Sequence, residues 1–149
     1  MKAVGLDLGE RRIGVAVSDR DGMLASPWTV IARSGERHTD HARVAALVAE
    51  VGAERVVVGL PVSLRGAEGP AAQAAREEAL ALAQVVGVPV ELADERLTTV
   101  TADRVLRAGD QRRERSAARR RQVVDQVAAA VMLQAFLDRR RGTVATGRS

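Results

Sequence analysis

The sequence predicts an α/β fold with a five-stranded mixed sheet, in which a three-strand antiparallel meander is joined by two parallel strands and flanked by helices. Three observations predict it. The first 32 residues contain three strand-like segments, the first two with apolar alternation, separated by turn signals. Later apolar segments alternate with stretches of helical period, as in parallel β–α–β units. The chain has 149 residues and is 46% hydrophobic, which suits one domain with a buried core.

The three N-terminal strands are expected over residues 2–8, 13–18 and 23–32. In the first two, large apolar side chains alternate with other residues, which places the two sets on opposite faces of a strand. Residues 21–22, Asp-Gly, are a strong turn signal before the third strand. Pro27 cannot donate a ladder hydrogen bond, so the third strand is predicted at the edge of the sheet.

The rest of the chain alternates between expected helices and strands. Glycine is suited to the position just after a helix, and Gly52 and Gly87 stand at such positions. Pro70 is favourable in the first turn of a helix. We expect a helix over 34–52, a strand over 55–60, a helix over 70–87, a strand over 88–93, a short helix over 99–108 and a long helix from Ser116 towards Gly142.

We expect a single domain over residues 1–141 and a flexible C-terminal tail over residues 142–149. The chain has no cysteine, which excludes disulfides, thiolate metal sites and a cysteine nucleophile. No apolar stretch approaches the length of a membrane span or of a signal-peptide core. We therefore expect a cytoplasmic protein that has no membrane partner.

Positive charge is concentrated in one part of the chain. The net charge is +4, yet residues 104–121 contain eight arginines and only two acidic residues. Local basicity of this kind is typical of a face that binds a polyanion, although a solvated arginine-rich loop is the alternative. With one Trp, one Phe and no Tyr, base stacking is not expected, so a nucleic acid would be held through its phosphates. The expected nucleic-acid-binding residues are Arg11, Arg12, Arg65, Arg112, Arg113, Arg115, Arg119, Arg120 and Arg121.

Three carboxylates stand in or beside apolar segments that are predicted to be buried: Asp7, Glu95 and Asp125. A buried charge is costly unless it is paired or holds a metal ion. Acids from distant parts of the chain could converge on divalent cations, which prefer oxygen ligands. These three residues are therefore the candidate catalytic and metal-binding residues, with one or two Mg²⁺ or Mn²⁺ ions as the cofactor.

Each acid also has a simpler interpretation. Asp7 could accept hydrogen bonds from amides of the turn that follows it. Glu95 could stabilise the start of the next helix. Asp125 could pair with Arg121 on a helix surface, although the alanines that follow it would let this helix approach the sheet closely.

Four other polar residues are given lesser roles. Thr98 and Thr99 could bind phosphate or cap the next helix, and capping is the favoured role. His38 and His41 are expected at the surface, outside the site.

The motifs, taken together and in order, resemble the YqgF/RuvX family of the RNase H-like superfamily, from Val4 to about Leu137. The resemblance implies an RNase H-like fold and a three-carboxylate centre whose acids fall on Asp7, Glu95 and Asp125. Family members are described as nucleases that mature the 5′ end of the 16S rRNA precursor, and some as resolvases of four-way DNA junctions. The matching pieces are Gly5-Leu6-Asp7-Leu8-Gly9, Arg12-Ile13-Gly14-Val15-Ala16, Val58-Gly59-Leu60-Pro61, Asp94-Glu95-Arg96-Leu97-Thr98-Thr99, and Val124-Asp125 with Ala128-Ala129.

The sequence departs from the family pattern at three places. Arg65 precedes a glycine where the family usually has an acidic or amide residue. Arg121 and Gln122 occupy a stretch where a lysine is usual, and arginine lacks the point-like charge of an ammonium. No fourth acid follows Asp125 by one helical turn, as it does in related resolvases, so one metal ion or two remain open.

The leading hypothesis is a metal-dependent nuclease that processes the 5′ end of 16S rRNA precursor by phosphodiester hydrolysis. Its expected partners are precursor rRNA, favoured over branched DNA, and ribosomal particles, with the protein a monomer or a homodimer. The first alternative is a Holliday junction resolvase, which needs two active sites and hence a dimer. A non-catalytic RNA- or ribosome-binding module is an alternative of another class. A sugar kinase or ATPase of the actin-like superfamily is disfavoured, because that architecture needs two such domains.

Overall fold

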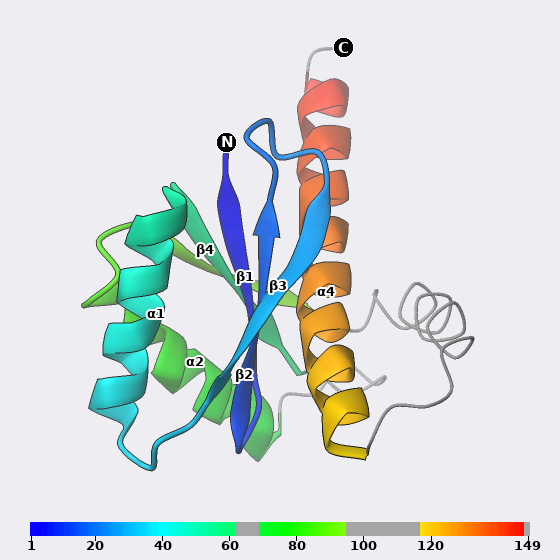
Figure 1. The fold of residues 1–149 in the computed structure, drawn as a ribbon. Coiled ribbons are helices and arrows are strands. Elements are labelled where there is room, and N and C mark those ends of the chain that lie inside the picture. Colours follow the sequence, from blue (N-terminus) through cyan, green and yellow to red (C-terminus); the bar gives the residue numbers. More distant parts are fainter. Residues whose placement is uncertain (62–68, 95–116, 148–149) are drawn as a thin grey trace.

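The computed structural model describes residues 1–61, 69–94 and 117–147, with the backbone alone for residues 94, 117–125 and 142–147. At its centre is a five-stranded sheet with the strand order β3-β2-β1-β4-β5 (Figure 1). β2 is antiparallel to β1 and β3, whereas β1, β4 and β5 are parallel, which confirms the predicted mixed sheet. The strands are β1 (Ala3–Leu8), β2 (Arg12–Ser18), β3 (Ala25–Ala32), β4 (Arg55–Leu60) and β5 (Val90–Asp94).

The strand β3 lies at an edge of the sheet, as Pro27 predicts. Pro27 faces Ala16 of β2, next to a shift of register between Val15 and Ala16. A proline is tolerated there because, among the residues that the structure describes, no strand pairs with the outer side of β3.

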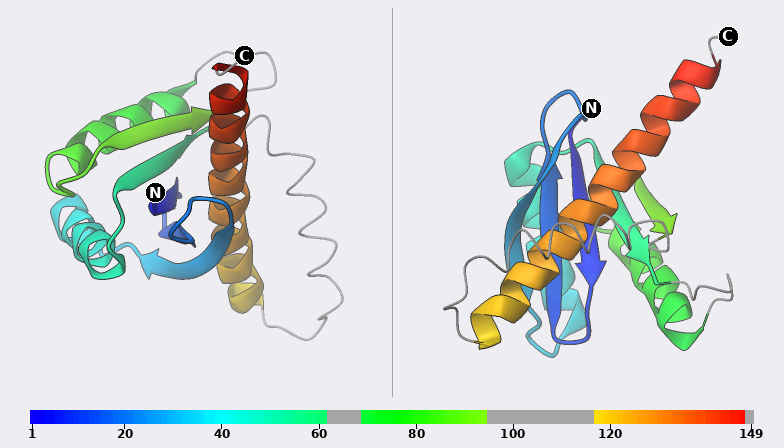
Figure 2. Two further views of the ribbon diagram at one scale, coloured as in Figure 1. Left: turned by 90° about the horizontal axis from the view of Figure 1, so that it is seen from above. Right: turned by 90° about the vertical axis from the view of Figure 1, so that its right-hand side faces the viewer.

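Helices cover both faces of the sheet, and each face has its own apolar core. On one face, α1 (Arg37–Val51) and α2 (Pro70–Ala83) pack on the large side chains of β1, β2 and β4. On the other face, α4 (Ala117–Gly147) packs on small residues such as Ala3 and Ala16 (Figure 2). The alternation along β1 therefore separates two layers, with large residues towards α1 and α2 and small residues towards α4.

Local sequence accounts for the end of α1 and the start of α2, whereas α2 ends at Ala83, before the expected Gly87. α1 ends before Gly52, which has a φ of 70° and donates its N–H to the carbonyls of Ala49 and Val48. A left-handed residue at this position favours glycine, as predicted. α2 begins with Pro70 in its first turn, where a missing N–H costs nothing.

α4 comes very close to the sheet at Gly5 of β1. A Cβ atom at Gly5 would lie 2.8 Å from Cβ of Leu133 and 3.3 Å from the carbonyl oxygen of Ala129. Only glycine leaves room for the helix at this distance. The close approach expected from the alanines of the last helix is therefore confirmed.

Some predicted elements lie outside the described residues, namely most of the loop over 61–69 and the short helix over 99–108. The last helix begins next to the expected Ser116 and continues past Gly142 to Gly147. The division into a domain over 1–141 and a tail over 142–149 stays a prediction. In the described part of the chain, no helix is both long and apolar enough to cross a membrane.

The packing at Gly5 predicts that Gly5→Ala lowers the free energy of unfolding by about 1–3 kcal/mol, because an extra methyl group must push α4 away from β1. Urea denaturation of the two proteins measures this difference. Gly69→Ala is the control without a steric clash, since a Cβ at Gly69 would meet no atom within 4 Å, and only the loss of a glycine N-cap, up to about 1 kcal/mol, is expected there. Equal stability of Gly5→Ala and the wild type would contradict the close approach of α4.

Candidate active site

The carboxyl ends of β1, β4 and β5 lie at the same end of the sheet, because these three strands are parallel. This border, formed by strand ends, is called the carboxyl edge. Asp7 is the second-last residue of β1. Asp94 ends β5, where it pairs with Leu60 at the end of β4. Glu95 follows in the sequence and lies outside the described residues. Ligand sites of open parallel sheets gather at this edge.

Small residues surround Asp7 on its face of the sheet. Asp7 shares this face with Gly5, and its partner on β2 is Gly14. The residue is half-buried. Its backbone carbonyl accepts a hydrogen bond of 3.1 Å from the N–H of Gly9, in the turn between β1 and β2. The neighbouring positions Gly5 and Gly14 therefore add no side chain beside the carboxylate.

The backbone of α4 brings Asp125 to the same end of β1. Near the start of β1, Leu137 lies against the turn at Gly22, and further along β1 Leu133 and Ala129 lie against Gly5. Asp125 is one turn before Ala129, about 6 Å along the helix axis. Asp7 is two strand residues beyond Gly5, about 6.6 Å along β1 towards the same end of the sheet, although α4 crosses β1 obliquely (Figure 2). The first turns of α4 accordingly lie at the end of the molecule where β1 terminates (Figure 1).

The basic residues predicted to bind nucleic acid fall into three groups. Arg11 is exposed in the turn after β1, and Arg12 is half-buried at the start of β2. This turn follows Asp7 directly. The second group belongs to the first turns of α4 and comprises Arg119, Arg120 and Arg121. The third group lies outside the described residues and comprises Arg65, Arg112, Arg113 and Arg115. Thr98 and Thr99 also lie outside the described residues.

The residues predicted as ligands suit a hard divalent cation. Their donors are carboxylate oxygens, which Mg²⁺ and Mn²⁺ prefer. Among the side chains that the structure describes, no three acidic or histidine groups could together hold a metal ion. Of the three predicted ligands, only Asp7 has a side chain that the structure describes. The small residues around its carboxylate are compatible with an ion at this edge of the sheet.

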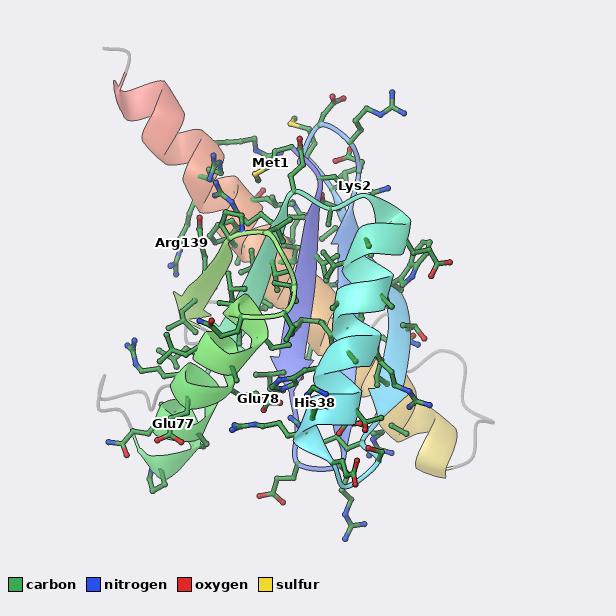
Figure 3. All side chains as sticks on the ribbon, turned by 90° about the vertical axis from the view of Figure 1, so that its left-hand side faces the viewer. Met1, Lys2, His38, Glu77, Glu78 and Arg139 are labelled. Carbon is green, nitrogen blue, oxygen red and sulfur yellow. The ribbon has the colours of Figure 1, made fainter. Side chains whose placement is uncertain are left out.

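A buried polar network that the sequence analysis missed lies on the opposite face, between α1 and α2. The guanidinium of Arg33 donates two hydrogen bonds of 2.8 and 2.9 Å to the carboxylate of Glu78. Nε2 of His41 lies 2.8 Å from the same carboxylate. Glu78 is found between α1 and α2, near the end of β1 (Figure 3).

The prediction that His41 lies at the surface is wrong, whereas His38 is exposed as predicted. His41 is buried because it shares the inner face of α1 with Val44, three residues later. Glu78 has the same signal, since it stands four residues before the buried Leu82 of α2. Each polar residue stands three or four positions from a buried apolar residue of its helix, and this spacing could have indicated that His41 and Glu78 are buried.

Glu78 is ionised in spite of its burial. Desolvation by burial would raise the pKa of Glu78, but hydrogen bonds from Arg33 and His41 outweigh it and lower the pKa below its ordinary value. The hydrogen bond to Glu78 in turn raises the pKa of Arg33. The pair is therefore charged at neutral pH.

The sequence is similar to a known family and to known proteins over nearly its whole length. A family model described as "RuvX: Holliday junction resolvase" matches residues 1–139. A protein of Chloroflexus aggregans is 49% identical over 139 residues, which cover 93% of this chain and 94% of that protein. A protein of Thermobifida fusca is 54% identical over 144 residues, with 94% and 89% covered. Both relatives are named "Putative pre-16S rRNA nuclease".

Solved structures with similar architecture confirm the predicted RNase H-like fold. RuvC of T. thermophilus in complex with a Holliday junction substrate has a TM-score of 0.62 at 22% sequence identity, over 96% of this chain and 97% of that one. A second structure of Thermus thermophilus RuvC gives a TM-score of 0.58 at 21% identity, over 96% and 98%.

The charged state of Glu78 predicts how acid affects stability. Because its pKa is lowered by folding, the unfolded chain takes up the proton first, so Glu78 stabilises the fold above about pH 5 and this contribution is lost as the pH falls through the lowered pKa. We expect Glu78→Gln to cost about 1–3 kcal/mol at pH 7 and less at pH 3. Urea denaturation of both proteins from pH 7 to pH 3 measures the difference, and a difference independent of pH would contradict the ionised pair.

Proposed function

The chain belongs to the RuvX family, and on this premise we propose that it is a metal-dependent nuclease that processes the 5′ end of 16S rRNA precursor. The observation that carries the proposal is the position of Asp7 at the carboxyl edge of the sheet. The strand end that leads to Glu95 lies on this edge, and the backbone of Asp125 lies one turn from the helix contact at Gly5. The names of the relatives support a precursor rRNA as the substrate.

In this proposal the carboxylates of Asp7, Glu95 and Asp125 hold one or two Mg²⁺ or Mn²⁺ ions. When bound, such ions activate a water molecule and stabilise the leaving oxygen of a phosphodiester. The chain would supply the oxygen ligands from three acids that are distant in the sequence and meet at one site. Gly14, the partner of Asp7 on β2, adds no side chain beside the proposed ligand.

The basic residues of the chain are proposed to bind the backbone of the nucleic acid. Arg11 and Arg12 follow Asp7 in the turn that borders the acids, so they are the first candidates for phosphate contacts. The arginines of residues 112–121 would extend this contact. With two aromatic residues in the whole chain, Trp28 and Phe136, recognition depends on phosphate positions and on the shape of the RNA.

We place the activity in the cytoplasm, with ribosomal particles as expected partners. A junction resolvase is the second candidate, because the matching family model is described as a Holliday junction resolvase. The two candidates share the acids and the mechanism. They differ in substrate and in assembly, since cleavage of a four-way junction at two strands requires a dimer.

The first prediction of this proposal concerns the central acid. Asp7→Asn removes a charged ligand but keeps the shape of the side chain, so we expect cleavage of structured RNA with Mn²⁺ to fall to background while RNA binding stays within about threefold, since phosphate contacts dominate affinity. Gel-based cleavage and fluorescence anisotropy measure the two effects. Glu10→Gln, an exposed acid of the adjacent turn, is the matched control and should cleave normally.

Two results would remove this assignment. Normal cleavage by Asp7→Asn would show that Asp7 holds no essential metal ion. Loss of cleavage by Glu10→Gln to the same extent would show that any charge change in this region abolishes activity.

The second prediction concerns the substrate. We expect the purified protein to cut precursor rRNA at its 5′ end at a higher kcat/KM than it cuts a four-way DNA junction, in parallel assays with Mn²⁺. Size measurement by light scattering accompanies the assay. Preferred cleavage of the junction by a dimer would replace the rRNA nuclease with the resolvase.

A further inference from the structure

We propose that Arg33 is a positioning residue for the active site, which fixes the turn after Asp7 and thereby the carboxylate of Asp7. This inference rests on the proposed function, because it concerns the residue proposed as the central metal ligand. Arg33 itself directly follows β3.

The side chain of Arg33 connects two parts of the molecule. Its Nε donates a hydrogen bond of 2.7 Å to the carbonyl of Gly9, two residues after Asp7. Its two terminal nitrogens bind the carboxylate of Glu78 on α2 at 2.8 and 2.9 Å. The guanidinium is planar, so the bonds to Glu78 determine the direction in which Nε points.

The turn itself is held at several backbone atoms. The backbone N–H of Arg33 donates to the carbonyl of Arg11 at 2.9 Å. The N–H of Gly9 donates to the carbonyls of Asp7 and Arg12 at 3.1 and 2.9 Å. A Cβ at Gly9 would lie 2.7 Å from the carbonyl oxygen of Arg12, so only glycine fits this tight turn. Arg33 therefore holds the turn through both its backbone and its side chain.

The other end of the network is also fixed. His41 of α1 contacts Glu78 at 2.8 Å, and Asp40 accepts a hydrogen bond of 2.9 Å from the N–H of Ser34, directly after Arg33. Both helices already share an apolar core with β1, through residues such as Val44 and Leu82. The network is thus not needed to attach the helices, and a buried ion pair is a weak source of stability. What it adds is a fixed position for Arg33.

A second arginine–glutamate pair provides the comparison. Nη1 of Arg55 lies 2.8 Å from Oε1 of Glu91, and Arg55 pairs with Ala3 at the opposite, amino end of β1. Nε of Arg55 is buried and has no hydrogen-bond partner among the described residues. The two pairs have the same chemistry, but only the pair at Arg33 reaches the turn beside Asp7.

The test compares Arg33→Met with Arg55→Met in the full chain. Calorimetry measures Mn²⁺ affinity, steady-state RNA cleavage gives kcat and KM, and amide hydrogen exchange without metal reports on the turn. We expect Arg33→Met to weaken Mn²⁺ binding about 10–100-fold, as for residues that orient a metal ligand. We also expect a lower kcat at nearly unchanged KM, and faster exchange at Gly9. Arg55→Met should stay within about twofold of the wild type in all three, because Arg55 lies at the opposite end of β1 from Asp7.

Arg33→Lys keeps the positive charge next to Glu78 and serves if Arg33→Met does not fold. Lysine lacks the planar guanidinium that donates to Glu78 and Gly9 at the same time, so we expect smaller changes of the same kind in Mn²⁺ affinity, kcat and exchange at Gly9. Unchanged Mn²⁺ affinity and unchanged exchange at Gly9 in a folded Arg33 variant would overturn the inference, as would equal effects of the two methionine variants. Failure of the proposed function is a separate result, because then the wild type itself would neither bind Mn²⁺ nor cleave RNA.

Discussion

The contact between α4 and Gly5 is the constraint on which the arrangement of the site depends. A helix can pass this close to a strand only where the strand has no side chain, and Gly5 provides that place. The contact sets the register of a 31-residue helix against β1. Asp125 is one turn from it in the helix, and Asp7 is two residues from it in the strand. Two acids separated by more than a hundred residues in the sequence thereby come to one end of the sheet.

The two faces of the sheet then have different tasks. Large side chains on one face form the main core with α1 and α2, and an ion-pair network at its margin holds the turn after β1. Small residues on the other face allow α4 to come near the sheet. Asp7 lies on this second face, at the end of a strand that is packed on both sides.

Much of this could be predicted from local sequence. The alternation in the first 18 residues determined two strands, Pro27 identified the edge, and Gly52 marked the end of a helix, because each depends on backbone chemistry within a few residues. The contacts of Arg33 and His41 with Glu78 could not, since these residues are 45 and 37 positions away from Glu78 and meet only through the packing of α1 and α2 on the sheet. The helical spacing of His41 and Val44 was a sign of burial that the prediction of a surface histidine overlooked, and it would not have identified the partner. The roles of Glu95 and Asp125 remain predictions that rest on the family resemblance and on strand and helix register.

The central claim is that three acids far apart in the sequence meet around one metal site. A crystal structure of the protein grown with Mn²⁺, with data collected at an energy where manganese scatters anomalously, tests it most directly. We expect an anomalous peak at the carboxyl ends of the parallel strands, with carboxylate oxygens of Asp7, Glu95 and Asp125 about 2.1 Å away. A peak at another place, or an Asp125 side chain that binds Arg121 and no metal ion, would contradict the claim.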